Sequence, residues 1–411
     1  MKDSGIEWIG EIPEGWEVGQ IGQLYSERRT KVSDKDYPPL SVTMKGILPQ
    51  LSTAAKTDAH DDRKLVCKGD FAINSRSDRR GSCGISEQDG SISLINTVLQ
   101  PRGEMNPGYY NWLFHTSMFA DEFYKWGHGI VDDLWTTGWS DMKKIGVPVP
   151  SKCEQKQIAE HLNFECSNID TILSRTRSSI EEYKKLKQAV ITQAVTKGVR
   201  GEREMKDSGV EWTGEIPVNW TIQRFARVAE VKSNLVSPDN YLEYPQISPE
   251  NIEKDSGKLL LPCRTVAEVG VISGNHLFYK GQILYSKIRP KLNKVCIAPF
   301  DGLCSADMYP IESKNDTRYI MYCILSNGFL QQVSMITENR VKMPKINQVE
   351  LSKVLVAIPE TIAEQKEIAD YLDAKCTEID GLIAKKEQLV KELESYKKSL
   401  IYEVVTGKRE V

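Results

Sequence analysis

The sequence has few of the features that mark secreted, membrane-bound or metal-binding proteins. Its nine cysteines are scattered without a Cys-x-x-Cys pair, and its five histidines show no metal-ligand spacing. No apolar run approaches the ~18 residues of a membrane span, and the first residues lack the apolar stretch of a signal peptide. These absences predict a cytoplasmic protein in a reducing compartment, with neither disulfides nor a structural metal.

Catalytic signatures are also scarce. The sequence contains no Walker phosphate loop and no Gly-x-Gly-x-x-Gly after a strand. The Asn/Asp-Pro-Pro-aromatic motif of amino-methyltransferases is missing, because Tyr37-Pro38-Pro39-Leu40 has the prolines without the preceding amide or acid. The paired acids Asp61-Asp62 and Asp132-Asp133 have no lysine-bearing strand beside them, as a nuclease would require. We therefore expect a non-catalytic chain that carries no cofactor of its own.

Excess positive charge is absent as well. The net charge is −3, and the charges of residues 1–150 and 205–358 sum to −4 and +2 respectively. A DNA-binding face must therefore be local, or a partner must supplement it. The hydrophobic share of 40% and the charged share of 27% are typical of a soluble globular protein. A length of 411 residues suggests about three domains.

What the sequence does have is a duplication. Residues 1–13, MKDSGIEWIGEIP, return as residues 205–217, MKDSGVEWTGEIP, and Trp16 matches Trp220. Further along, Glu154-Gln155-Lys156 returns as Glu364-Gln365-Lys366, an offset of 210. Such long repeats reveal the architecture before any motif does. The chain is a tandem duplication in which a variable globular unit is followed by a long helix, twice.

The pattern inside each repeat predicts the fold class. Short alternating runs that follow Lys-Gly turns indicate strands, and other stretches carry helix-like spacing, so each globular unit is expected to be mixed α/β (α+β). We expect two such target-reading domains, separated by two long antiparallel coiled-coil helices with pseudo-two-fold symmetry. The expected segments are residues 1–150, 151–204, 205–358 and 359–411.

Both long helices carry a heptad pattern. Apolar residues recur in steps of four and three, a period of 3.5 that is typical of a supercoiled seam. Polar residues interrupt the two copies at the same steps, Thr176 with Lys386 and Lys187 with Lys397, and such interruptions fix register. The alternative is two unrelated amphipathic helices on separate domains. The residues expected to pair the helices are Leu162, Ile169, Leu173, Ile180, Leu372, Ile379, Ile383, Val390 and Leu393.

Two loops at equivalent places carry basic and short polar side chains. Arginine forks suit guanine edges and phosphates, lysines suit phosphates, and asparagine suits adenine. One such loop could be merely a solvated basic turn, but two at equivalent places favour DNA contact. The candidate residues are Asn74, Ser75, Arg76, Arg79 and Arg80 in the first repeat, and Lys287, Arg289, Lys291, Asn293 and Lys294 in the second.

A second candidate segment lies further along each unit. In the first unit Asp132 or Asp133 could accept a hydrogen bond from a cytosine amino group, or could equally cap the helix that follows. The counterpart in the second unit is more basic and contributes Asn339, Arg340 and Lys342. Both readings of the aspartates remain open on the sequence alone.

Taken together, these motifs resemble the specificity (S) subunit of type I restriction–modification systems. The resemblance covers essentially the whole chain and rests on residues 1–16 and 205–220, on the helix starts at 148–158 and 359–368, and on Thr192-Gln193-Ala194-Val195-Thr196-Lys197-Gly198. The second copy departs from it by ending Val405-Thr406-Gly407-Lys408, so its last turn could make different contacts.

The resemblance implies a role and a set of partners. It implies two target recognition domains that each read one half of a bipartite DNA site. It also implies assembly on double-stranded DNA with two modification subunits and with restriction subunits. Those partners would hold S-adenosylmethionine for adenine methylation, and ATP with Mg²⁺ for translocation and cleavage. The alternative is a non-catalytic coiled-coil scaffold whose globular ends bind proteins, which the net charge of −3 slightly favours.

Overall fold

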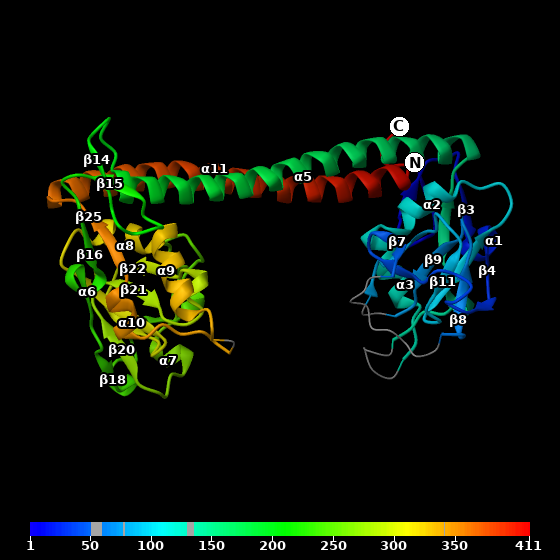
Figure 1. Cartoon of the computed structure of the whole chain (residues 1–411). Helices are drawn as coiled ribbons and strands as arrows, with labels where there is room; N and C mark the ends of the chain where they lie inside the picture. The colour runs from blue at the N-terminus through cyan, green and yellow to red at the C-terminus, as the bar shows by residue number, and fades with distance from the viewer. Residues whose placement is uncertain (51–59, 77–78, 130–134, 341) are drawn as a thin grey trace. The chain divides into compact units, whose positions relative to one another are not determined.

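The computed structural model forms two compact units (Figure 1). It describes residues 1–50, 60–76, 79–129, 135–340 and 342–411. Unit 1 comprises Met1–Thr176 together with Gln388–Val411, and unit 2 is Arg177–Glu387. The long helices α5 (Lys152–Lys197) and α11 (Ile362–Val405) are therefore each divided between the units.

Antiparallel sheets form the body of unit 1. The central sheet has the order β10-β9-β12-β4, a second has the order β11-β8-β5, and β6-β7, β13-β3 and β1-β2 are pairs. The strands are β1 (Lys2–Asp3), β2 (Glu11–Ile12), β3 (Glu17–Gln20), β4 (Tyr25–Glu27), β5 (Lys31–Val32), β6 (Leu40–Thr43), β7 (Gly46–Pro49), β8 (Arg63–Val66), β9 (Phe71–Asn74), β10 (Cys83–Ile85), β11 (Gly90–Ile92), β12 (Asn96–Pro101) and β13 (Gly146–Val149). The shorter helices are α1 (Ile21–Leu24), α2 (Pro107–Phe114), α3 (Ser117–Lys125) and α4 (Trp139–Met142).

Aromatic side chains hold α2 and α3 against the central sheet of unit 1. Phe71 of β9, Phe114 of α2 and Phe119 of α3 are fully buried, and the ring centroids of Phe114 and Phe119 lie 4.5 Å apart. Every residue of β9 is buried, as expected of a central strand covered on both faces. This packing fixes the strand end from which the candidate loop of unit 1 emerges.

Unit 2 repeats this plan with different sequences. Its sheets have the orders β17-β24-β21-β22 and β18-β20-β23-β19, and β16-β25 and β14-β15 are pairs. The strands are β14 (Met205–Asp207), β15 (Glu215–Pro217), β16 (Thr221–Arg224), β17 (Ala229–Val231), β18 (Leu235–Val236), β19 (Gln246–Ile247), β20 (Asn275–Phe278), β21 (Ile283–Ser286), β22 (Val295–Ile297), β23 (Gly302–Cys304), β24 (Met308–Ser313) and β25 (Leu355–Ile358). The helices are α6 (Phe225–Val228), α7 (Val266–Val269), α8 (Thr317–Leu325), α9 (Asn327–Thr337) and α10 (Gln348–Lys353), with 3-10 turns η3 (Pro238–Asn240), η4 (Pro249–Asn251) and η5 (Pro290–Leu292).

The repeated Glu-Gln-Lys motif fastens each long helix to its globular body. Gln155 Oε1 accepts a hydrogen bond from the backbone N–H of Asn106, which caps α2 (2.8 Å). Gln365 Oε1 likewise accepts from the N–H of Asp316, which caps α8 (3.0 Å). The matched glutamines therefore satisfy equivalent backbone donors beside two helix starts, which explains why both repeats contain them.

The repeated tryptophans bind the glutamates of the same motif. The indole N–H of Trp16 donates to Glu154 (3.0 Å), and that of Trp220 donates to Glu364 (3.2 Å). Hydrogen bonding with Ser151, and then with Trp16, lowers the pKa of Glu154. Glu364 gains an additional partner, because Arg203 donates to it at 2.7 Å. These tryptophans thus connect the repeated segment at the beginning of each globular body (residues 1–16 and 205–220) to the start of the long helix that follows that body.

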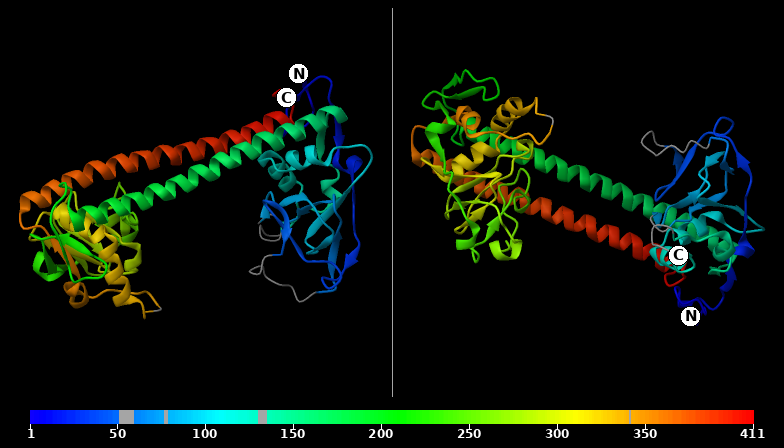
Figure 2. Two further views of the ribbon diagram at one scale, coloured as in Figure 1. Left: turned by 45° about the horizontal axis from the view of Figure 1, so that its top comes forward. Right: turned by 90° about the horizontal axis from the view of Figure 1, so that it is seen from below.

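Within each unit the long helices α5 and α11 lie side by side (Figure 2), and the same ion pair joins them. In unit 2, Lys187 contacts Asp380 at 2.9 Å and Arg200 contacts Glu367 at 2.7 Å. Residue numbers rise along one helix as they fall along the other, so the pair is antiparallel. In unit 1, Lys397 contacts Asp170 at 2.7 Å, the duplicate of the first pair. The fold-class prediction of mixed α/β bodies with antiparallel helices is confirmed.

The structure places the expected seam residues as follows. Those that are buried are Leu162, Ile169, Leu173, Ile180, Leu372 and Ile379, and those that are half-buried are Ile383, Val390 and Leu393. The helix ends are tied by backbone carbonyls: Tyr109 Oη donates to Val405 O (2.7 Å), and Tyr319 Oη donates to Val195 O (3.3 Å). Each globular body therefore holds the start of one long helix and the end of the other.

Candidate nucleic-acid interface

In each unit, a backbone hydrogen bond links two loops beside the end of the central strand. The first loop, residues 74–82 or 286–294, follows β9 or β21, and the second loop, residues 126–137 or 337–346, follows α3 or α9. In unit 1 the N–H of Thr137 donates to Ser75 O (3.0 Å). In unit 2 the N–H of Ile346 donates to Lys287 O (2.9 Å). The two segments that the sequence indicated separately thus form one surface in each unit.

The first loop of unit 1 turns some predicted contact residues inward and others outward. Asn74 and Ser75 are buried: Asn74 Oδ1 accepts from the N–H of Arg76 (3.0 Å), and the Ser75 hydroxyl lies 2.9 Å from that of Thr97. Arg76, Arg79 and Arg80 are exposed. Asn74 and Ser75 therefore shape the loop, whereas the arginines project from it.

Arg80 is held in a defined orientation. Its guanidinium carbon lies 3.8 Å from the ring centroid of Tyr124, and its Nη1 lies 3.1 Å from Asp121. Stacking on an aromatic face together with an ion pair reduces the rotamer freedom that an exposed arginine would otherwise have. The sequence analysis did not include Tyr124, because its role depends on the packing of α3 beside the loop.

The first loop of unit 2 has a different internal structure. Arg289 adopts a left-handed backbone conformation (φ 45°), and its N–H donates to Pro344 O (2.8 Å). Asn293 is buried, and its amide donates to Ile324 O (3.0 Å). The side chain of Asn293 is therefore turned into the protein in this structure, and its contact with DNA stays a prediction. Arg289 and Lys291 are exposed.

The remaining lysines of this loop are partly engaged. Lys294 Nζ donates to Pro249 O (2.6 Å) at η4, and Lys287 Nζ lies 5.3 Å from the ring centroid of Tyr309. Lys287 also faces His276, and burial and then this lysine lower the pKa of the imidazole. A hollow of about 640 Å³ is lined by Lys287, His276 and Tyr309 among others. Lys287 therefore lies at the edge of a concave surface.

The second loop is described only in part in unit 1 and almost completely in unit 2. Asp132 and Asp133 lie outside the described residues. In unit 2, Arg340 forms a fork with Glu350, with one contact at 3.1 Å, while Asn339 and Lys342 are exposed. Lys345, which the sequence analysis missed, contacts Asp307 at 2.9 Å. The second loop of unit 2 thus presents exposed polar groups beside a fixed ion pair.

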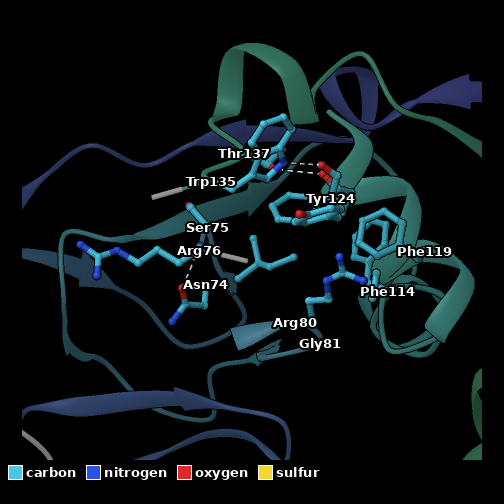
Figure 3. A pocket seen from close by; sticks show the side chains of 13 residues that line it. Asn74, Ser75, Arg76, Arg80, Gly81, Phe114, Phe119, Tyr124, Trp135 and Thr137 are labelled. Atoms are coloured by element: carbon cyan, nitrogen blue, oxygen red, sulfur yellow. Dashed lines mark hydrogen bonds between the residues drawn. The ribbon is translucent and has the colours of Figure 1, made fainter. Parts of the chain in front are cut away.

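A small cavity lies between the two loops of unit 1 and α3 (Figure 3). Its volume is about 20 Å³, and its lining includes Phe114, Phe119, Tyr124 and Trp135 together with Arg76 and Arg80 at the loop. The sequence analysis did not propose Trp135 as a contact residue. Its indole N–H donates to Tyr124 O (2.9 Å), which orders the described end of the second loop.

The described residues also bear on metal binding and on membrane insertion. No group of three or more His, Cys, Asp or Glu side chains in that part of the chain could hold a metal ion. No described helix is both long and apolar enough to cross a bilayer.

Comparison with known proteins shows what this chain is similar to. Residues 217–392 match the family described as the type I restriction modification DNA specificity domain. The type I restriction enzyme EcoDI specificity subunit of Escherichia coli is 40% identical over 243 residues, which is 56% of this chain and 54% of that protein. Both matches make this chain similar to type I restriction–modification specificity subunits. The chain therefore aligns with about half the length of this relative.

Other specificity subunits match over nearly the whole chain. The MjaVIII specificity subunit of Methanocaldococcus jannaschii is 24% identical over 97% of this chain and 93% of its own length. A chain from a structure of type I R-M complex assembly and conformational transition matches with a TM-score of 0.72 and 11% identity, covering 97% of this chain and 100% of that chain. The HsdS subunit of Thermoanaerobacter tengcongensis matches with a TM-score of 0.54 and 14% identity, over 97% and 98%. These likenesses show the fold, and the family match over residues 217–392 and the EcoDI likeness agree with the predicted resemblance.

Proposed function

We propose that this specificity subunit reads a bipartite DNA site and performs no catalysis itself. The observation that carries the proposal is the repeated loop pair: the same backbone bridge joins two loops in both units, but the exposed side chains differ. Unit 1 presents Arg76, Arg79 and Arg80, whereas unit 2 presents Arg289 and Lys291. One scaffold with two sets of side chains suits the recognition of two different half-sites.

We also propose that the long helices set the distance between the half-sites. Helix α5 has 46 residues and α11 has 44. At about 1.5 Å per residue, 46 residues extend over roughly 69 Å. Half-sites one helical turn of DNA apart lie about 34–36 Å from centre to centre. Continuous helices of this length, paired by ion pairs and apolar residues, support a spacer role.

The modification subunits are proposed to dock on the helices. In unit 1, Ile172 of α5 and Tyr396 of α11 are 46% and 45% exposed, and in unit 2 Leu186 and Leu382 are 48% and 37% exposed. Each residue directly precedes a seam position, which places both members of each pair on the same edge of an antiparallel coiled coil. Exposed apolar pairs of this kind mark protein-binding surfaces.

The duplication also supports a stoichiometry. Ile172 and Leu382 are 210 residues apart, as are Leu186 and Tyr396, so each unit carries the same pair of positions. Two equivalent surfaces suit two modification subunits, one per unit. In the proposed complex these subunits hold S-adenosylmethionine, and restriction subunits that use ATP and Mg²⁺ join the same assembly.

The genomic methylation pattern tests this function. A host that expresses the chain with its modification partner should carry methylated adenines in two short motifs separated by a fixed number of unspecified base pairs. A host that lacks only this chain is the control, and the motif should disappear there. A motif that persists without the chain, or a complex that binds no DNA, would instead support the protein-binding scaffold.

A further inference from the structure

The cavity of unit 1 can hold only a small group. Its volume of about 20 Å³ is close to the ~10–15 Å³ that a single water needs. A whole nucleobase is therefore too large, whereas one methyl group fits. Figure 3 shows the cavity between the first loop, which carries Asn74, Ser75 and Arg76, and the aromatic side chains of α2 and α3.

The lining favours an apolar occupant. Aromatic rings from Phe114, Phe119 and Tyr124 supply much of the wall. The Thr137 hydroxyl donates to Phe123 O (2.7 Å), and the Ser75 hydroxyl is paired with Thr97. The indole N–H of Trp135 is used as well. A buried water needs two to four polar partners, and these three described side chains already have partners, which favours an apolar occupant over a water.

We propose that this cavity takes the 5-methyl group of a thymine in the half-site read by unit 1. The inference rests on the proposed DNA-reading function. Among the groups that the bases present in the major groove, the thymine methyl is the apolar one, and phenylalanine and other apolar side chains contact it. The cavity would therefore distinguish a T·A pair by shape, without a hydrogen bond to the base.

The rim supports DNA as the partner that brings the methyl group. Arg80 lines the cavity and is exposed, so its positive charge lies beside the cavity, whereas the side chain of the exposed Arg76 points away from the aromatic rings (Figure 3). Tyr124 and Asp121 hold Arg80 in place, as described above. Cations at the edge of an apolar cavity suit a ligand whose phosphates surround an apolar group.

The equivalent loop of unit 2 packs on its own helices. Pro290 of η5 is buried, and the buried amide of Asn293 donates to Ile324 O at the end of α8. The turn η5 packs on α9, the counterpart of α3. Methyl recognition by this route is therefore assigned to unit 1 and not to unit 2.

Deoxyuridine substitution tests the inference directly, because it removes only the methyl group. The complex of this chain with its modification partner is titrated with duplexes that carry the methylated site, in which each thymine is replaced in turn by deoxyuridine. One position in one half-site should show binding weakened about 4-fold, the value of one buried methyl group. Every other thymine should tolerate the replacement.

A variant that fills the cavity tests whether the thymine that responds to deoxyuridine contacts this cavity. Ala120→Leu places a larger side chain in the lining of the cavity, on α3. It should weaken binding of the thymine duplex and bring the ratio of thymine to deoxyuridine affinity close to one. Ser117→Leu adds similar bulk at an exposed position of the same helix and should leave the ratio at about four.

Two results would overturn the inference while leaving the proposed function intact. The first is specific methylation of a site in which no thymine responds to deoxyuridine. The second is a response that survives unchanged in Ala120→Leu, since the methyl group would then be read elsewhere. Loss of all site-specific methylation would instead be a failure of the proposed function, so the two are distinguishable.

Discussion

At the residue scale, exposure separates the side chains that can meet DNA from those that shape the loops. Arg76 and Arg289 follow their central strands by two and three residues, and both are exposed. Arg289 is further fixed by its left-handed backbone and by the bond from its N–H to Pro344 O. Preorganised cations of this kind reduce the entropy lost on binding.

Removing either arginine should weaken DNA binding by the complex. We expect Arg76→Ala and Arg289→Ala each to lower affinity about 10-fold, consistent with ~1–3 kcal/mol per guanidinium contact. If the contact is to phosphate, the slope of log affinity against log salt should fall by about one. Fluorescence anisotropy at several salt concentrations measures both quantities. Arg227→Ala, at an exposed site of α6, is the control, and unchanged affinity and slope in both variants would remove these loops from the interface.

The sequence could indicate these loops but not the direction of each side chain. In a strand or a helix, side-chain direction follows a regular period, so the sequence indicates which residues face the core. A loop has no such period. Asn74 and Asn293 carry the chemistry of base readers, yet both are buried and bond within the loop or to α8. Tyr124 was missed because its role comes from packing between segments that are distant in sequence. Trp135 ends the second candidate segment of unit 1, but the sequence did not indicate its contact with α3.

At the element scale, Lys187 and Lys397 interrupt the heptad patterns, and each has a specific aspartate partner on the other long helix. Lys187 is 7% exposed at its side chain and contacts Asp380, which also contacts Lys258 at 2.7 Å. In the duplicate pair, Lys397 is 24% exposed and Asp170 is 59% exposed. The two lysines were matched across the repeat from the sequence, but the aspartates were not named as their partners, because that pairing requires the antiparallel register.

The two pairs should differ in their contribution to stability. Asp380→Asn leaves a nearly buried ammonium without its counter-charge and should lower the free energy of unfolding by about 2 kcal/mol. Asp170→Asn, the matched control in the duplicate pair, should lower it by less than about 1 kcal/mol because solvent screens the exposed pair. Urea unfolding of the full chain measures both. Equal decreases in the free energy of unfolding would show that the burial of Lys187 does not strengthen its ion pair.

At the scale of the whole molecule, the duplication was readable from sequence because its frame is nearly identical in both copies. The division of the chain was less accessible: the expected boundaries followed the ends of the helices, whereas the compact units divide within them. That division arises because each helix packs on one body at its start and contacts the other through its last turns, as Tyr109 and Tyr319 illustrate.

Lengthening both helices should change the spacing of the DNA site but not its letters. Duplicating residues 180–186 in α5 and 381–387 in α11 adds one heptad to each, and the Lys187–Asp380 register places these stretches opposite each other. Seven residues add about 10 Å, equivalent to about three base pairs at ~3.4 Å each. Methylation sequencing measures the new spacing. Replacing the same stretches by other heptads of equal length is the control, and altered half-site letters would contradict a spacer role.

Unit 1 contains residues from both ends of the sequence, and this has a consequence for biosynthesis. Unit 2 has its full set of residues once position 387 has left the ribosome. Unit 1 acquires Leu400, Val404 and Val405, which belong to its buried core, only after all of unit 2 has been synthesised. A stop codon before Leu400 would therefore injure the domain made first, and the nascent N-terminal half must wait, incomplete, until the second long helix has been made.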